Sequence, residues 1–226
     1  MDKLYYPFET FNQNFQNELN VIKKINAEKN QKYGKEGNFF SSFQLIWDLG
    51  IMPIENFLVM RGILDKFNRI VNLKAKKSNA VSWEGIKESV YDMVGYALLL
   101  HAYLQCRKNN KFDWNTALGS IDSLISYIMK TFVEKNSDYS SKTTDEEAQK
   151  KQNAIENFVI VEKCWLSTTE DGIMARIAIK VQRIINLLVN KADEKSLWAE
   201  ILDFIVYCLI LNLVLDWKAL PPKINS

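Results

Sequence analysis

Apolar residues recur every three or four positions along most of this chain, which is the spacing of one face of an α-helix. One such face is made by Ile86, Val90, Met93, Ala97, Leu100 and Leu104, and an earlier one by Phe8, Phe11, Phe15, Leu19 and Ile22. No run shows the apolar and polar alternation of a half-buried strand. The pattern therefore predicts an all-α fold.

Few residues that break helices interrupt these segments, since the chain has only four prolines and eight glycines. The predicted helices cover residues 1–27, 55–73, 83–105, 122–135, 155–166, 173–190 and 196–217. A turn is expected at 49–53 and a solvated loop at 74–79, where Gly, Pro or short polar residues cluster. The polar stretch 138–152 is expected to be a mobile loop.

Four segments of the chain recur in the same order at a nearly constant offset. Residues 28–33 match 134–139, residues 66–73 match 180–187 and residues 92–96 match 203–207, while 38–43 is loosely echoed by 153–158. Such self-similarity indicates a tandem duplication of one helical unit. We expect a first copy at 1–108, a second copy at 116–218 and a tail at 219–226.

Composition places the chain among ordinary globular proteins, with 47% apolar and 25% charged residues. Its 226 residues suffice for one large domain or two small ones. The net charge of +2 and the scattered lysines give no electrostatic reason to expect a nucleic-acid partner.

The cysteines and the N-terminal residues favour a cytoplasmic protein. Three widely spaced cysteines, Cys106, Cys164 and Cys208, form neither a disulfide framework nor a metal-binding pattern, and they fit a reducing compartment. The first residues lack the apolar core of a signal peptide. The apolar stretch 201–217 is interrupted by Asp203, Asn212 and Asp216, so we expect a buried core helix and no membrane span.

Two of the predicted helices carry charged stripes. Arg61, Asp65 and Arg69 are spaced by four residues, and so are Glu88, Asp92 and Tyr96, which places each set on one helix face. The second helix is otherwise so apolar that its carboxylates need a compensating cation.

Two interpretations of these stripes stay open. In the first, Asp92 pairs with Arg69 or Arg61 and the stripe is an internal salt-bridge network. In the second, Asp65, Glu88 and Asp92 converge across two antiparallel helices and hold Mg²⁺. Arg61, Lys66 and Arg69 would then bind phosphate oxygens beside the metal.

The motifs Lys29-Asn30-x-x-Tyr33-Gly34, Arg61-x-x-x-Asp65-Lys66-x-x-Arg69 and Glu88-x-x-x-Asp92-x-x-x-Tyr96 resemble the nucleotide-modification-associated domain family that is common in phages. That family is similar to the MazG-like and dimeric dUTPase-like all-α pyrophosphohydrolases. The resemblance implies cleavage of nucleoside triphosphates to monophosphate and pyrophosphate, with Mg²⁺ on helix carboxylates. It covers residues 28–104 well and 134–215 weakly, and it implies a phage origin and the host cytoplasm as location.

The predicted second copy departs from this pattern in its acids. Ile179 stands at the position of Asp65 and Ala199 at that of Glu88. Pyrophosphohydrolases of this type also usually place two acids on the first metal helix, where this chain has Asp65 alone. The second copy therefore looks degraded as a metal site.

The second copy keeps the bases Lys180 and Arg183, either as phosphate ligands or as structural partners of Asp203. Next to the lost acid, Glu200-x-x-Asp203 forms an acidic pair on one helix face. Because relatives of this kind act as homodimers, the two copies are expected to pack as an internal pseudo-dimer, in a monomer or in a homodimer of the chain.

Three functions are compatible with these residues. The leading expectation is a Mg²⁺-dependent (deoxy)nucleoside triphosphate pyrophosphohydrolase with Asp65, Glu88 and Asp92 as metal-holding catalytic residues. The alternative is a non-catalytic protein that binds a nucleotide or nucleotide signal as a sensor or sponge. The third is a helical scaffold whose charged stripes are fully paired internally.

Overall fold

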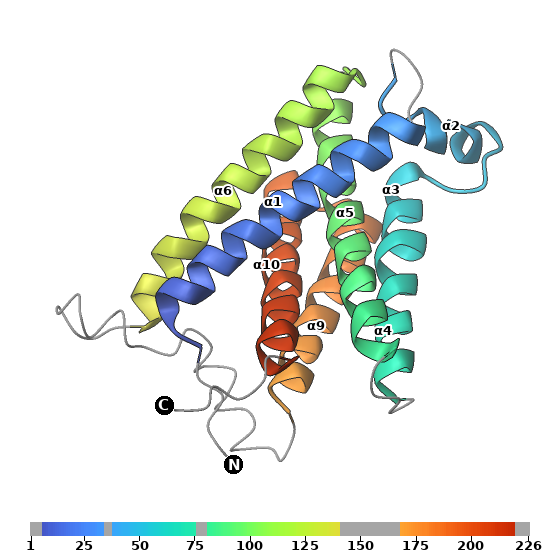
Figure 1. Cartoon of the computed structure of the whole chain (residues 1–226). Coiled ribbons are helices and arrows are strands. Elements are labelled where there is room, and N and C mark those ends of the chain that lie inside the picture. The colour runs from blue at the N-terminus through green and yellow to red at the C-terminus, as the bar shows by residue number, and fades with distance from the viewer. Residues whose placement is uncertain (1–5, 34–37, 76–80, 141–167, 220–226) are drawn as a thin grey trace, which may run out of the picture.

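The computed structural model of the chain describes residues 6–33, 38–75, 81–140 and 168–219, and it confirms the all-α prediction. Helices make up almost all of these residues, and the described part of the chain contains no strand (Figure 1). The helices are α1 (Phe8–Tyr33), α2 (Ser41–Asp48), α3 (Ile54–Phe57), the π-helix η1 (Leu58–Leu64), α4 (Asp65–Ala75), α5 (Val81–Asn109), α6 (Trp114–Ser140), α9 (Thr169–Val189) and α10 (Glu194–Ala219).

Most of the predicted helices are present, with different bounds in several cases. The helix predicted at 1–27 runs over Phe8–Tyr33, and the short helix α2 (Ser41–Asp48) was not predicted. The helix predicted at 55–73 is present, but α3, η1 and α4 form it in succession, with a π-helical stretch in the middle. The helix predicted at 122–135 begins earlier, at Trp114. The helix predicted at 155–166 and most of the loops predicted at 74–79 and 138–152 lie outside the described residues. The described ends of both loops are helical, because α4 continues to Ala75 and α6 to Ser140.

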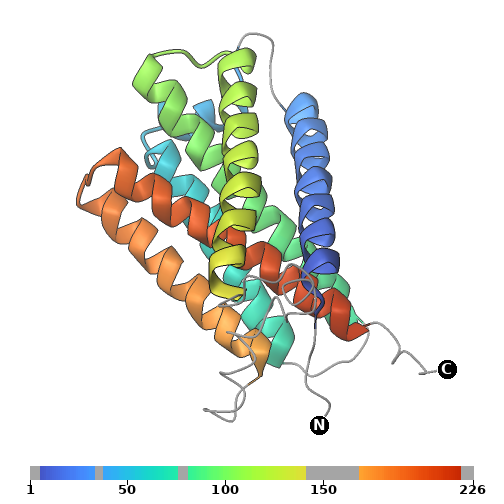
Figure 2. The same cartoon turned by 90° about the vertical axis from the view of Figure 1, so that its left-hand side faces the viewer.

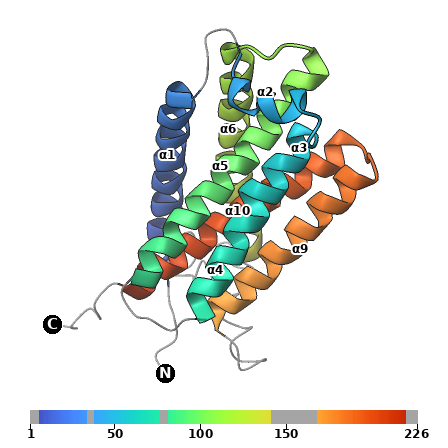
Figure 3. The ribbon, with the colours of Figure 1, turned by 90° about the vertical axis from the view of Figure 1, so that its right-hand side faces the viewer.

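Two helical hairpins lie side by side, and their second helices meet in the centre. The first hairpin joins η1 and α4 to α5, the second joins α9 to α10, and α5 packs directly against α10. Helices α1 and α6 lie together across the other side of this central pair, as Figures 1 and 2 show from two directions. In Figure 3, α4 lies between α5 and α9, with α10 behind them.

Asn110 directly follows α5 and Lys191 lies two residues after the end of α9, and both are in the left-handed region at φ 50°. In each case the amide of this residue and the amide of the next residue bond back to the last helical turn, in the pattern of a Schellman motif. The following helices, α6 and α10, then start on an aspartate cap: Asp113 accepts from Thr116 N at 2.9 Å, and Asp193 accepts from Ser196 N at 2.9 Å.

The core runs along both sides of α5 and α10, which explains why these helices are apolar all round. Helix α10 is long and apolar enough to cross a membrane by length and composition, yet 67% of its most apolar window is buried inside the protein. This burial is what the core-helix expectation requires. Cys106 and Cys208 are free thiols in this core, and burial raises the pKa of Cys106 to about 11.

Candidate functional site

The charged side chains singled out in the sequence gather where α1, α4 and α5 meet. This first charged cluster consists of Lys29, Arg61, Asp65, Lys66, Arg69, Glu88 and Asp92. Lys29 comes from α1, the next four from the η1–α4 helix and the last two from α5. The antiparallel crossing of α4 and α5 accounts for the pairing, because residues that ascend one helix meet residues that descend the other.

Asp92 is the centre of the cluster. Its Oδ1 accepts from Lys29 Nζ at 2.7 Å, and its Oδ2 lies 2.7 Å from Lys66 Nζ. Its side chain is only 22% exposed. Burial alone would raise the pKa of Asp92, but the hydrogen bonds from Lys29 and Lys66 outweigh burial and hold that pKa below its ordinary value. Asp92 is therefore a carboxylate at neutral pH, held between two ammonium groups from different helices.

The other two candidate carboxylates each have a different basic partner. Arg61 Nη1 lies 3.0 Å from Asp65 Oδ2 within the same helix, and Arg69 Nη2 lies 3.8 Å from Glu88 Oε2 across the hairpin. Among the described residues, no group of three or more His, Cys, Asp or Glu side chains is placed to hold a metal ion. The Mg²⁺ site therefore stays a prediction. For Asp65, Glu88 and Asp92 to hold the metal together, their ion pairs with the basic side chains must open.

The backbone beside the cluster has an uncommon form. Arg61 and Gly62 lie in the π-helical stretch that directly precedes Asp65, and single π-turns inside α-helices often mark functional sites. Gly62 is buried against Tyr96, one turn after Asp92 on α5, so closely that a Cβ at this position would lie 2.7 Å from the Tyr96 Cβ and nearer still to the ring. The glycine thus sets how close η1 comes to α5.

A second charged cluster lies on the other hairpin and consists of Lys180, Arg183, Glu200 and Asp203. Lys180 Nζ is 2.9 Å from Glu200 and 2.7 Å from Asp203, and Arg183 Nη1 is 3.2 Å from Glu200. The side chain of Lys180 is only 12% exposed. Burial opposes its charge, but hydrogen bonds to Asp203 and Glu200 prevail and raise the pKa of Lys180.

The two clusters pair the same residue types, although Glu200 stands one position after the counterpart of Glu88. In each hairpin the first helix supplies Lys-x-x-Arg, as Lys66 and Arg69 or as Lys180 and Arg183, and the second helix supplies the acids. The lysine meets the aspartate and the arginine meets the glutamate in both. The clusters differ in their lysines and glutamates, because Lys180 contacts both acids of the second cluster and is more buried than Lys66, and Glu200 is less exposed than Glu88.

Sequence reasoning identified the charged residues but not all of their partners. Asp92 was expected to pair with Arg69 or Arg61 if the stripe were structural, and its partners are instead Lys66 and Lys29. Lys180 and Arg183 were expected either to bind phosphate or to pair with Asp203. Lys180 does pair with Asp203, and Arg183 pairs with Glu200. Lys29 was part of a motif in the sequence, but its ion pair with Asp92 was not expected, because residue spacing does not predict that α1 packs over α5.

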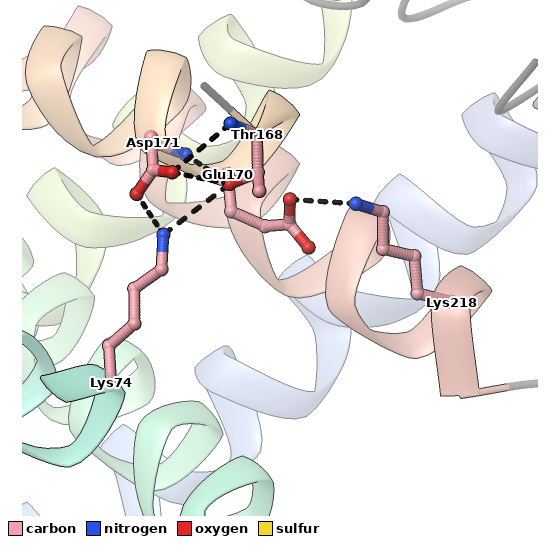
Figure 4. A network of polar contacts seen from close by, with 5 residues as sticks. All are labelled: Lys74, Thr168, Glu170, Asp171 and Lys218. Atoms are coloured by element: carbon pink, nitrogen blue, oxygen red, sulfur yellow. Dashed lines mark hydrogen bonds and ion pairs between the residues drawn. The ribbon is translucent and has the colours of Figure 1, made fainter. Parts of the chain in front are cut away.

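A third polar network ties the two hairpins together at their lower ends (Figure 4). Lys74, at the end of α4, forms an ion pair with Asp171 at the start of α9. Asp171 and Thr168 form the capping box of α9, with Thr168 Oγ1 accepting from Asp171 N at 3.2 Å. Lys218 of α10 pairs with the buried Glu170 at 2.8 Å. The network fixes α9 between α4 and α10.

Comparison of the chain with protein-family models, with curated proteins and with solved structures gives no match. The family resemblance of the motifs therefore stays a prediction.

Proposed function

We propose that this protein is a Mg²⁺-dependent nucleoside triphosphate pyrophosphohydrolase whose substrate binds at the first charged cluster. The observation that carries the proposal is Asp92 held by lysines of two helices, with a second acid–base pair, Glu88 and Arg69, one turn away. A site that must bind both a cation and a polyanion needs both signs of charge. Without a ligand, its own charges neutralise each other.

The charges of the cluster suit such a ligand. Four bases, Lys29, Arg61, Lys66 and Arg69, exceed the acids by one, so the cluster carries a small positive charge. A magnesium nucleoside triphosphate carries a net negative charge. On binding, the bases would exchange carboxylate oxygens for phosphate oxygens, which are equally good acceptors for charged donors. The acids would then face the metal.

The roles of the residues follow from their positions. Lys66 and Arg69 lie on one face of α4 and would hold adjacent phosphates, while Lys29 would close over them from α1. Asp92, Glu88 and Asp65 supply carboxylate oxygens, the ligands that Mg²⁺ prefers. When bound, Mg²⁺ supplies Lewis-acid polarisation of the phosphate oxygens and lowers the pKa of water. In the reaction, water adds to the α-phosphorus and the bond to the bridging oxygen breaks, which releases pyrophosphate.

We further infer that the two hairpins are copies of one unit, packed as an internal pseudo-dimer. The shared pairing of Lys66 with Asp92 and of Lys180 with Asp203 supports this origin. Ile179 replaces Asp65 in the second copy, so that copy is proposed to lack hydrolysis. The second charged cluster would serve as a structural half.

A non-catalytic nucleotide-binding protein, a sensor or sponge, is the second candidate. One observation favours it. In the described part of the chain no three acidic, His or Cys side chains are grouped to hold a metal ion, and each acid of the first cluster is paired with a base. Bases alone suffice to bind phosphates. Here the chain would bind nucleotides without cleaving them.

Incubation of the purified protein with a panel of nucleotides, followed by chromatography, separates these candidates. The pyrophosphohydrolase yields monophosphate and pyrophosphate together, with Mg²⁺ and not with EDTA. Asp92→Asn should abolish the reaction, because the first cluster loses its central carboxylate. Asp203→Asn is the matched control, since it removes the corresponding carboxylate of the second cluster and should leave turnover intact.

The other outcomes are equally distinct. Intact nucleotides that raise the melting temperature of the wild type, but not of Lys66→Ala, would move the assignment to the binding protein. Loss of turnover in Asp203→Asn but not in Asp92→Asn would place the site on the α9–α10 hairpin and contradict the proposal. If nucleotides are neither cleaved nor stabilise the protein, both clusters are structural networks.

A further inference from the structure

A cavity lies between the first half of α1 and the end of α10, away from both charged clusters. Its volume is about 470 Å³, which is within the range of small-molecule sites. All of the lining residues except Leu213 carry polar side-chain oxygens or aromatic rings. The lining residues are Tyr6, Asn14, Asn17, Glu18, Leu213, Asp216 and Trp217. Neither the proposed hydrolysis nor nucleotide binding uses any of them.

The floor of this cavity has a carboxylate oxygen with only one long hydrogen bond. Glu18 is almost fully buried, and its Oε1 is engaged by Tyr91 Oη at 3.2 Å and by Lys87 Nζ at 3.4 Å. Its Oε2 receives one long contact, from Asn212 Nδ2 at 3.4 Å. A buried acceptor with so weak a donor is costly, so this corner favours a ligand that brings N–H groups.

The walls are aromatic. The rings of Tyr6 and Trp217 stack at 4.2 Å with an interplanar angle of 20°, and Tyr6 is fixed further by Asn14 Nδ2, which donates to its hydroxyl at 2.7 Å. Both rings line the cavity. Ring faces attract cations and cover hydrocarbon, so the walls suit a positively charged group with an apolar body.

The charge of the cavity points the same way. Glu18 and Asp216 are both acidic, and the one basic side chain paired with them among the described residues is Lys87. Burial opposes the charge of Lys87, but the hydrogen bond to Asp216 and the nearness of Glu18 prevail and raise its pKa, so it stays charged. The three side chains together thus keep one negative charge in excess. The carboxylate of Asp216 is 47% exposed and stands at the entrance, whereas Glu18 lies at the floor.

We propose that this cavity binds a small primary alkylammonium ion that carries an apolar or aromatic body. The ammonium donates to Glu18 Oε2 at the floor, and the body packs on Tyr6 and Trp217. The site differs from the first charged cluster in the sign of its charge, since it has acids to spare where that cluster has bases. The ligand is therefore a cation, and it binds independently of any nucleotide.

Calorimetry with three probes of matched shape tests the proposal on the full chain. Phenethylammonium should bind. Phenethyl alcohol has no charge and should bind at least about tenfold more weakly, because the charge-assisted hydrogen bonds are lost. The N,N,N-trimethyl analogue keeps the charge but has no N–H donor, and it should show the same loss. Equal binding of all three probes, or no binding of phenethylammonium at millimolar concentration, would overturn the proposal.

Variants locate the binding. Glu18→Gln should weaken phenethylammonium about tenfold, whereas Glu55→Gln, which removes a comparably buried carboxylate paired with Arg107 elsewhere, should not. Trp217→Leu should weaken it through loss of the aromatic wall, and this variant decides the matter if Glu18→Gln does not fold. Unchanged affinity in a folded Glu18→Gln or Trp217→Leu would place the probe elsewhere. Asp92→Asn should bind normally, so failure here is distinct from failure of the nucleotide proposal.

Discussion

Replacement of Gly62 by alanine tests the close approach of η1 to α5 beside the first charged cluster. Glycine inside a helix is less favourable than alanine by about 1 kcal/mol, so propensity alone would make Gly62→Ala stabilising. At Gly62 the added methyl would lie 2.7 Å from Tyr96 Cβ and nearer to the ring carbons. The nearest atoms are the rigid base of that side chain, so a rotation of the ring cannot clear the overlap and the two helices must separate.

The magnitude follows from these opposed effects. Overpacking of a filled interior costs about 1–3 kcal/mol, and the gain in propensity offsets about 1 kcal/mol of it. We expect a net loss of up to about 2 kcal/mol in the free energy of unfolding. Gly119→Ala is the matched control, because Gly119 lies in α6 with no atom within 4 Å of the added Cβ. That variant should gain up to about 1 kcal/mol.

Urea unfolding followed by circular dichroism measures both variants. The double variant Gly62→Ala, Tyr96→Ala should recover part of the loss, with a coupling energy of about 1 kcal/mol in a double-mutant cycle. If Gly62→Ala is as stabilising as Gly119→Ala, or if the cycle shows no coupling, the contact between Gly62 and Tyr96 does not set the distance between the helices.

Three further predictions concern pH and helix capping. Burial lowers the pKa of His101 to about 4, below its unfolded value of 6.5, so the wild type should lose up to about 3 kcal/mol of stability as pH falls from 6.5 to 4; His101→Gln should flatten this slope in denaturant titrations. Asp92 has a lowered pKa, so its pairing with Lys66 stabilises the fold above the unfolded pKa of about 4 and is lost as pH falls through the folded value. The stability difference between wild type and Asp92→Asn should therefore vanish in acid, and a constant difference would contradict the pairing. Thr168→Ala removes the capping box with Asp171 and should cost about 1 kcal/mol in urea unfolding, while no change would show that the cap is dispensable.

Much of the candidate site could be predicted, because ion pairs across a helical hairpin depend on spacing. Lys66 and Arg69 are three residues apart and Glu88 and Asp92 four, so either pair lies on one face of its helix. Which base meets which acid depends on the register of the two helices. The π-turns of η1 alter that register, and a period of 3.6 residues does not reveal them.

The sequence by itself determined the class of the fold, because burial of a periodic apolar stripe is a local requirement that each helix must satisfy. It also determined that α10 belongs in the core, since an all-round apolar helix has no face for water. Only the tertiary structure decided that α1 crosses both α5 and α10, which brings Lys29 to Asp92 of α5 and Glu18 to Asn212 of α10. Those pairs are separated by 63 and 194 residues. Contacts over such separations depend on how all the apolar stripes pack together, which no single stretch of sequence specifies.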